Sequence, residues 1–163
     1  MADKLSDIAF WQRIDPHLTT SGRLAAADLD RLHTAGVTHV INLALAHSPG
    51  ILRNEADEVA LRGMHYMHIP VPFDTPAEPH FAAFSKAMSE SEGHHVHVHC
   101  VRNWRVSAFI YRWHRDERAM PEAQARLLMA QQWVPEASDH QDAPAWARFI
   151  AGARGTLRSS LGA

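Results

Sequence analysis

The sequence predicts an α/β fold: a single domain with a largely parallel central sheet flanked by helices. Short β-branched runs alternate along the chain with segments of helical spacing. Glycine, proline and asparagine stand between these segments as turn signals. At 163 residues, the chain is long enough for one compact domain with a sizeable core. We expect that domain over residues 1–153, followed by a flexible C-terminal tail over 154–163.

The elements can be followed in order. We expect an opening strand and turn within residues 7–20, and a helix within 24–36 that stops at Gly36. The run 37–43 is β-branched and predicts a strand. Asn54 begins a helix over 54–62, with acids in its first turn, and Gly63 ends it. The remaining elements are a strand over 65–71, a helix over 78–90, a strand over 94–99, and helices over 105–115, about 121–133 and about 142–152.

Composition excludes several classes of protein. The chain is 46% hydrophobic and 21% charged, with no apolar run near the ~20 residues that a membrane span needs. The first residues, MADKLSDIAFWQR, lack the apolar core of a secretory signal, so we expect a cytoplasmic protein. A net charge of −2 gives no reason to expect a nucleic-acid or anionic-membrane partner. The single cysteine excludes an internal disulfide.

The 13 histidines raise the question of a metal site. His95, His97 and His99 share one face of the predicted strand 94–99, and imidazoles on one face can ligate zinc. No carboxylate or cysteine is spaced to complete such a site, and Cys100 points to the other face. We therefore expect no metal and no cofactor, and histidines that hydrogen-bond neighbouring loops.

Cys100 stands at the turn between a buried strand and a helix, within the segment HHVHVHCVRNWRVSAFIYRW. In α/β folds ligands bind outside the carboxyl ends of the strands, and Cys100 directly follows the strand 94–99. Such a turn points backbone N–H groups at one spot, and the helix dipole adds partial positive charge there. An unperturbed thiol has a pKa near ~8.5, so a shift of about two units makes it mostly thiolate at neutral pH. The segment therefore predicts an anion-binding turn with Cys100 as its functional centre.

The residues around Cys100 divide by expected role. The backbone amides that bind the anion belong to Val101, Arg102, Asn103, Trp104, Arg105 and Val106. His99 supports the loop, and the side chains of Arg102 and Arg105 add positive charge. Asparagine tolerates a positive φ, which suits Asn103 in mid-turn. The hydroxyl of Ser107 is placed to hydrogen-bond the thiolate.

The same segment resembles the active loop of cysteine-dependent protein tyrosine and dual-specificity phosphatases, whose signature is His-Cys, five residues, Arg, and then Ser or Thr. The stretches TSGRLAAADLDRLHTAGVTHVINL and YMHIPVPFDTP, and the helix from Glu55 to Gly63, are similar to those of a bacterial subfamily of small phosphatase-like proteins. The resemblance covers roughly residues 13–130. It implies hydrolysis of a phosphoric monoester, on a phosphorylated protein or a small anionic substrate, through a thiophosphate on Cys100. It also implies a general acid on a separate loop, where Asp74 lies in the matching segment.

One departure from the signature leaves two alternatives open. The family arginine belongs six residues after the cysteine, where this chain has Val106, and Arg105 stands one place earlier. Ser107 keeps the hydroxyl place. The spacing of four residues between the cysteine and the arginine also resembles the tighter loop of rhodanese-type sulfurtransferases, whose thiolate carries a persulfide. A non-catalytic module that binds phosphate or another anion is the third hypothesis. The acid also has alternatives in Asp139, His140 and Asp142.

Overall fold

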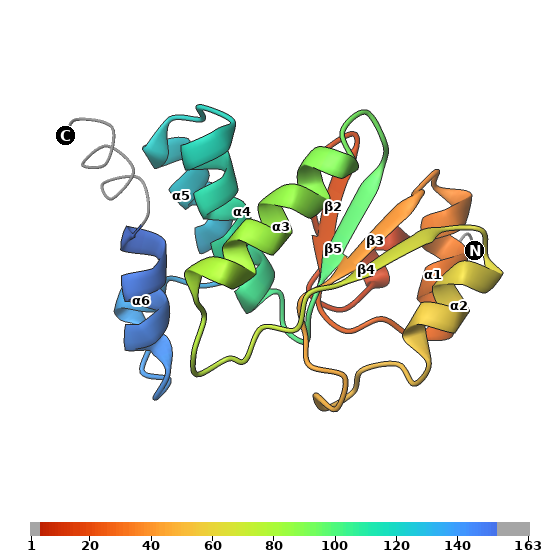
Figure 1. Cartoon of the computed structure of the whole chain (residues 1–163), viewed down its shortest axis with the longest axis horizontal. Coiled ribbons are helices and arrows are strands. Elements are labelled where there is room, and N and C mark those ends of the chain that lie inside the picture. Colours follow the sequence, from red (N-terminus) through yellow and green to blue (C-terminus); the bar gives the residue numbers. More distant parts are fainter. Residues whose placement is uncertain (1–3, 153–163) are drawn as a thin grey trace.

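The computed structural model describes residues 4–152, which form one five-stranded sheet (Figure 1). Its strands are β1 (Gln12–Asp15), β2 (Leu18–Ser21), β3 (His39–Asn42), β4 (His65–His68) and β5 (Val96–His99), in the spatial order β1-β2-β5-β3-β4. β2, β5, β3 and β4 run parallel, and β1 pairs antiparallel with β2. β5 is therefore the central strand, and its carboxyl end opens between those of β2 and β3.

Helices cover both faces of the sheet. They are α1 (Ala26–Thr34), α2 (Glu55–Leu61), α3 (Glu78–Glu90), α4 (Trp104–Glu117), α5 (Glu122–Ala130) and α6 (Ala143–Ala151), with short 3-10 turns η1 (Leu5–Asp7) and η2 (Pro135–Ala137). α1 and α2 lie on one side of the sheet, and α3 to α6 lie on the other (Figure 1). This arrangement is the three-layer α/β fold that the sequence predicts.

Each face of the sheet has its own hydrophobic core. The larger core includes Phe84 of α3 and Phe109 of α4, and the smaller one includes Leu29 of α1. In β3, Val40 packs into the smaller core and the next residue, Ile41, into the larger one. Successive strand side chains point to opposite faces, so a strand buried on both sides needs an unbroken apolar run.

The predicted elements are present, with one substantial difference near the start of the chain. Residues 5–21 form η1 and the hairpin β1–β2, where we expected one strand and a turn. The hairpin turns at Pro16, and Asp15 Oδ1 accepts a hydrogen bond from the His17 backbone N–H at 2.7 Å. This aspartate turn stabilises a reversal that strand periodicity does not reveal. The predicted tail over 154–163 lies outside the described residues.

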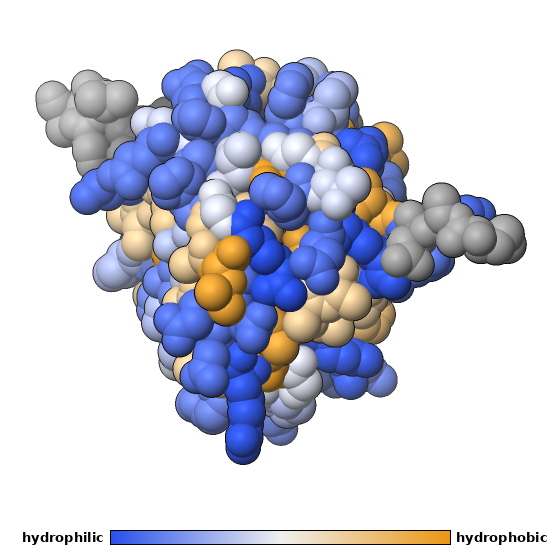
Figure 2. All heavy atoms as spheres, turned by 90° about the vertical axis from the view of Figure 1, so that its right-hand side faces the viewer, coloured by the Kyte–Doolittle hydropathy of each residue, from blue (hydrophilic) through white to orange (hydrophobic). Residues whose placement is uncertain are grey.

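The outer surface of the α1 and α2 layer is mostly hydrophilic (Figure 2). Within residues 4–152, no helix combines the length and the apolar character that crossing a bilayer requires.

Gly22, directly after β2, lies against the turn that follows Cys100. A Cβ there would stand far inside van der Waals contact of the Val101 carbonyl oxygen and 2.7 Å from Phe10 Cδ2. The Val101 carbonyl is also held in place, because it accepts a hydrogen bond from the Arg23 backbone N–H at 3.0 Å. We therefore expect Gly22→Ala to lower the free energy of unfolding by about 1–3 kcal/mol, measured by urea denaturation. Gly152→Ala is the matched control: its Cβ would have its nearest neighbour at 3.5 Å, so a change within about 0.5 kcal/mol is expected. Equal losses in the two variants would contradict this account.

Candidate active site

Cys100 lies at the bottom of a pocket at the carboxyl edge of the sheet. Its side chain is 1% exposed and lines a cavity of about 230 Å³. The cavity is lined by Ser48, Pro49, Phe73, Cys100, Val101, Arg102, Trp104, Arg105 and His140. The strand–turn–helix context predicted from the sequence is therefore present, and four distant segments of the chain close around it.

The Cys100 turn is held by its neighbour strand. The Cys100 backbone N–H donates to the Ser21 carbonyl at 3.4 Å. Asn103 is fully buried with φ of 64°, and its amide donates to the Phe10 carbonyl at 2.9 Å and to Thr20 Oγ1 at 3.0 Å. The left-handed conformation of Asn103 lets the chain reverse from the turn into α4.

Backbone N–H groups in this turn are left free for a ligand. Those of residues 101–106 donate to no backbone carbonyl within the described part of the chain. Asn103, the residue before α4, also provides no side-chain cap for the helix. Free N–H groups at the start of a 14-residue helix, together with the helix dipole, favour an anion.

Arg105 brings an unpaired positive charge into the pocket. Its side chain lines the cavity although the residue is only 8% exposed, and its Nε is buried with no hydrogen-bond partner. Within residues 4–152 its guanidinium forms no ion pair, and its Cζ lies 5.4 Å from the centre of the Phe73 ring. Arg102 is exposed at the rim, with its guanidinium 5.8 Å from the Trp104 ring. A buried guanidinium without an anionic partner is costly, so this pocket favours an anion.

Aromatic side chains form one wall of the pocket. Phe73 lies 6.1 Å from Trp104, 5.1 Å from His140 and 5.3 Å from Trp146 between ring centroids. The Trp104 ring stacks on Trp133 at 4.6 Å with an interplanar angle of 2°. This wall gives the pocket an apolar side beside its cationic one.

His140 is the imidazole that lines the pocket. Its Nδ1 accepts a hydrogen bond from the Asp142 backbone N–H at 3.1 Å, so the proton of a neutral ring lies on Nε2. Asp74, the predicted general acid, is exposed and does not line the cavity, although its neighbour Phe73 does. Its Oδ1 accepts a hydrogen bond from the Thr75 hydroxyl at 3.3 Å.

The side chain of Arg105 and those of the two residues that follow it lie in different places. Val106, at the usual arginine place, is fully buried in the larger core. The Ser107 hydroxyl donates to the Trp104 carbonyl at 3.1 Å and lines a small cavity beside Tyr111 and Met129, away from Cys100. Successive helical residues are rotated by about 100°, so Arg105 and Ser107 face nearly opposite directions. The structure therefore brings Arg105 to Cys100, and not Ser107.

His99 has a buried partner that the sequence reasoning missed. Its Nε2 lies 2.7 Å from Glu55 Oε2, and its Nδ1 lies 3.3 Å from the Cys100 carbonyl. The Glu55 and His99 side chains are 3% and 0% exposed. In the sequence, Glu55 is one of three acids in the first turn of α2, and no local signal distinguishes it from Asp57 or Glu58.

His97 shares the face of β5 with His99 but has different partners. Its ring lies 2.8 Å from Thr19 Oγ1 and 2.8 Å from Ser21 Oγ. Burial, and next the neighbouring His99, lower the pKa of His97 well below its ordinary value, so this ring is neutral. Within residues 4–152, no group of three or more metal-ligating side chains is arranged to hold an ion.

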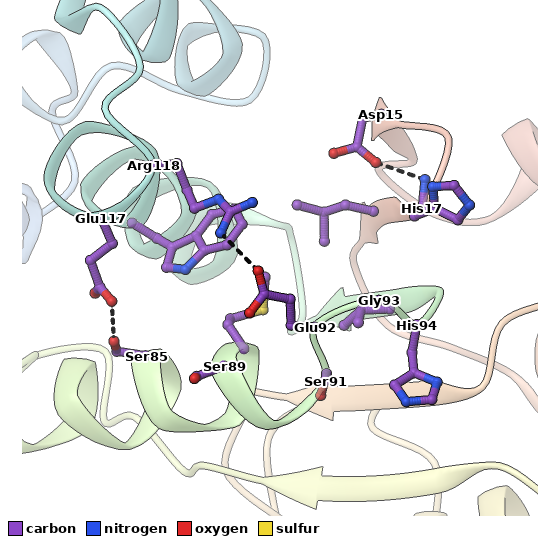
Figure 3. A pocket seen from close by; sticks show the side chains of 14 residues that line it. Asp15, His17, Ser85, Ser89, Ser91, Glu92, Gly93, His94, Glu117 and Arg118 are labelled. Atoms are coloured by element: carbon purple, nitrogen blue, oxygen red, sulfur yellow. Dashed lines mark hydrogen bonds and ion pairs between the residues drawn. The ribbon is translucent and has the colours of Figure 1, made fainter.

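A second cavity, of about 210 Å³, lies at the opposite edge of the sheet (Figure 3). Its acidic side chains have partners: Glu117 accepts a hydrogen bond from Ser85, and Glu92 lies 3.6 Å from Arg118. It has no nucleophilic thiol and no unpaired arginine among its lining residues, so the pocket at Cys100 is the candidate active site.

Comparison with solved structures places this chain in a family. A crystal structure from Shewanella putrefaciens CN-32, described as "Putative phosphatase (DUF442)", is 32% identical with a TM-score of 0.78, covering 90% of this chain and 92% of that one. The chain belongs to the DUF442 family. The resemblance drawn from the Cys100 segment is thus confirmed at the level of the family, since the Shewanella protein is described as a putative phosphatase.

More distant structures share the DUF442 fold. TpbA from P. aeruginosa, in a complex with phosphotyrosine, is 16% identical with a TM-score of 0.72, covering 99% of this chain and 94% of TpbA. PTPMT1 in complex with PI(5)P is 14% identical with a TM-score of 0.70, covering 92% of this chain and 99% of PTPMT1. No family model and no curated protein sequence matches the chain.

Asn103 provides a test of how the turn is held. Asn103→Gly keeps the left-handed conformation and loses the two side-chain hydrogen bonds, which stabilise by about 0.5–1.5 kcal/mol each. Asn103→Ala loses the same bonds and adds about 1 kcal/mol of left-handed strain. We expect both variants to be less stable than the wild type in urea denaturation, and the alanine variant to be the less stable of the two. An alanine variant as stable as the glycine variant would contradict the conformational role.

Proposed function

We propose that this DUF442 protein is a phosphatase that hydrolyses phosphoric monoesters with Cys100 as its nucleophile. The observation that carries the proposal is one pocket lined by Cys100 and by the unpaired Arg105, in a turn whose N–H groups at residues 101–106 donate to no backbone carbonyl within the described part of the chain. A phosphoryl group needs a nucleophile on one side and donors around its equatorial oxygens, and this pocket supplies both. A phosphorylated protein or a small anionic molecule is the proposed substrate.

The reaction proceeds in two displacements. The Cys100 thiolate forms an S–P bond while the bond from phosphorus to the leaving oxygen breaks, and that oxygen takes a proton from the enzyme. Water then attacks phosphorus, the S–P bond breaks, and inorganic phosphate leaves with the thiolate restored. The N–H groups and Arg105 hold the phosphoryl oxygens through both steps.

Two groups are candidates for protonating the leaving oxygen. His140 lines the pocket, with an N–H on Nε2 in its neutral form. Asp74 follows Phe73 on the loop between β4 and α3, and its exposed side chain would have to rotate to reach the pocket. Ser107 supports the first turn of α4 through its bond to Trp104.

The spacing of Cys100 and Arg105 favours a second candidate function, sulfur transfer. A turn with four residues between cysteine and arginine is tighter than the phosphatase signature and suits a smaller group on the thiolate. In that reaction the Cys100 thiolate attacks the outer sulfur of thiosulfate, a new S–S bond forms, and sulfite leaves. Cys100 then carries a persulfide.

Substitution of Cys100 and Arg105 tests the phosphatase proposal. With an aryl phosphate at mildly acidic to neutral pH, we expect Cys100→Ser to lower kcat by more than about 10³-fold. Arg105→Lys keeps the charge but loses the planar, two-pronged donor, so kcat/KM should fall about 10²-fold. Arg118→Lys, at the far end of α4, is the control and should retain wild-type turnover.

Two results would contradict the enzymatic form of the proposal. One is a wild-type protein that hydrolyses no phosphate ester over this pH range. The other is wild-type turnover in Cys100→Ser. Phosphate binding without turnover, retained in Cys100→Ser, would instead favour a module that binds anions without catalysis.

Mass spectrometry after treatment with thiosulfate tests the sulfur-transfer alternative. That alternative predicts one added sulfur atom in the wild type, removed by a reductant, and none in Cys100→Ser. Because Cys100 is the single cysteine of the chain, any persulfide must lie on it. An unmodified wild-type mass would count against sulfur transfer.

A further inference from the structure

The hydrogen-bond partners of His99 restrict where its protons lie. Nε2 faces a carboxylate oxygen of Glu55 at 2.7 Å, and Nδ1 faces the Cys100 carbonyl oxygen at 3.3 Å. A carbonyl and an ionised carboxylate only accept hydrogen bonds, so both bonds require an N–H on each ring nitrogen. His97, two residues earlier, bonds to two hydroxyls, which both donate and accept, and needs only one ring proton.

Glu55 is the anion that such a doubly protonated ring requires. Its side chain is 3% exposed, and a buried carboxylate is retained only when it is paired and hydrogen-bonded. Besides His99, the Tyr66 hydroxyl faces it, and that hydroxyl accepts a hydrogen bond from Asn42 Nδ2 at 3.0 Å. Burial, with the Glu55 charge as the next cause, raises the pKa of Tyr66, so its hydroxyl keeps its proton. Glu55 Oε1 is buried with no hydrogen-bond partner, so the carboxylate depends on His99 for its hydrogen bond.

The role of Glu55 in α2 does not explain its burial. Acids in the first turn stabilise a helix through its dipole, but Asp57 and Glu58 occupy the same turn. Asp57 is exposed, and Glu58 pairs with Arg62 at 2.8 Å. Glu55 alone among these acids reaches His99, which directly precedes Cys100.

We propose that Glu55 is a positioning residue for the Cys100 site. Its carboxylate holds His99 as an imidazolium whose Nδ1–H donates to the Cys100 carbonyl, which orients the turn and places positive charge beside the thiolate. This inference rests on the proposed function only where turnover is concerned, because the state of the thiol can be measured without a phosphate ester. α2 thereby contributes to a pocket whose lining it does not form.

The rate of alkylation by iodoacetamide measures how reactive the Cys100 thiol is, because Cys100 is the single cysteine of the full chain. Glu55→Gln keeps the size of the side chain and removes its charge, and at pH 7 we expect it to slow alkylation about tenfold. Asp57→Asn removes an equal charge from the same helical turn and should alkylate within about twofold of the wild type. Equal rates in the wild type and a folded Glu55→Gln would overturn the proposal.

Turnover separates this proposal from the proposed function. If the protein hydrolyses an aryl phosphate, Glu55→Gln should lower kcat about tenfold and leave KM within about twofold, because the N–H groups and Arg105 still bind the ester. A change in KM alone would overturn the positioning role while leaving the phosphatase intact. Absence of turnover in the wild type would overturn the phosphatase, and the alkylation result would still decide the role of Glu55.

A spectroscopic measurement on the wild type covers the case in which Glu55→Gln does not fold. Nitrogen-15 NMR distinguishes a histidine ring with two N–H groups from one with a single N–H, and His99 can be assigned through its backbone connectivities. We expect both ring nitrogens of His99 to be protonated at pH 7, and His97 to carry one ring proton. A neutral His99 ring at pH 7 would overturn the proposal.

Discussion

The candidate site depends on how the Cys100 turn is fixed against the end of β2. Val101 accepts a hydrogen bond from the Arg23 backbone N–H, Gly22 leaves no side chain between the two segments, and Asn103 bonds across to Phe10 and Thr20. These contacts use the carbonyls and the asparagine side chain of the turn. The N–H groups of residues 101–106 therefore remain free of backbone partners within the described part of the chain. An anion-binding turn needs this division, since N–H groups spent on internal bonds cannot bind a ligand.

The charges around Cys100 follow a consistent pattern. Arg112 and Arg115, further along α4, are buried but paired with Glu78 and Asp116. Arg105, on the same helix, is buried without a carboxylate, and it is the one of the three that lines the pocket. A buried arginine is ordinarily neutralised inside the protein, because an unpaired charge costs several kcal/mol. The missing counter-charge at Arg105 is thus best supplied by a ligand.

Local sequence signals predicted the strand, the turn and the place of Cys100 between strand and helix, because each is encoded within the continuous stretch from His94 to Arg115. They could not reveal Glu55, which lies 44 residues from His99 along the chain and is set against it only by the order of β5, β3 and α2 in space. The aromatic wall was invisible for the same reason, since Phe73, Trp104 and His140 come from three separate segments. The sequence also did not reveal the direction of the Ser107 side chain. Ser107 keeps the spacing of the family hydroxyl, but it lies two helical residues after Arg105 and faces away from the pocket.

Arg105 stands one place before the arginine of the phosphatase signature, and this shift changes which groups of the loop face Cys100. In the phosphatase signature arginine and hydroxyl are neighbours, but here Val106 separates them and packs into the core. Arg105 gains the pocket because it lies near the start of α4, and Ser107, about 200° further round, then cannot also face the thiolate. Ser107 does not line the described pocket, so under the proposed function the stabilisation of a Cys100 thiolate falls to the backbone N–H groups, Arg105 and His99. In the proposal for Glu55, its buried carboxylate supports His99 and so contributes to that stabilisation.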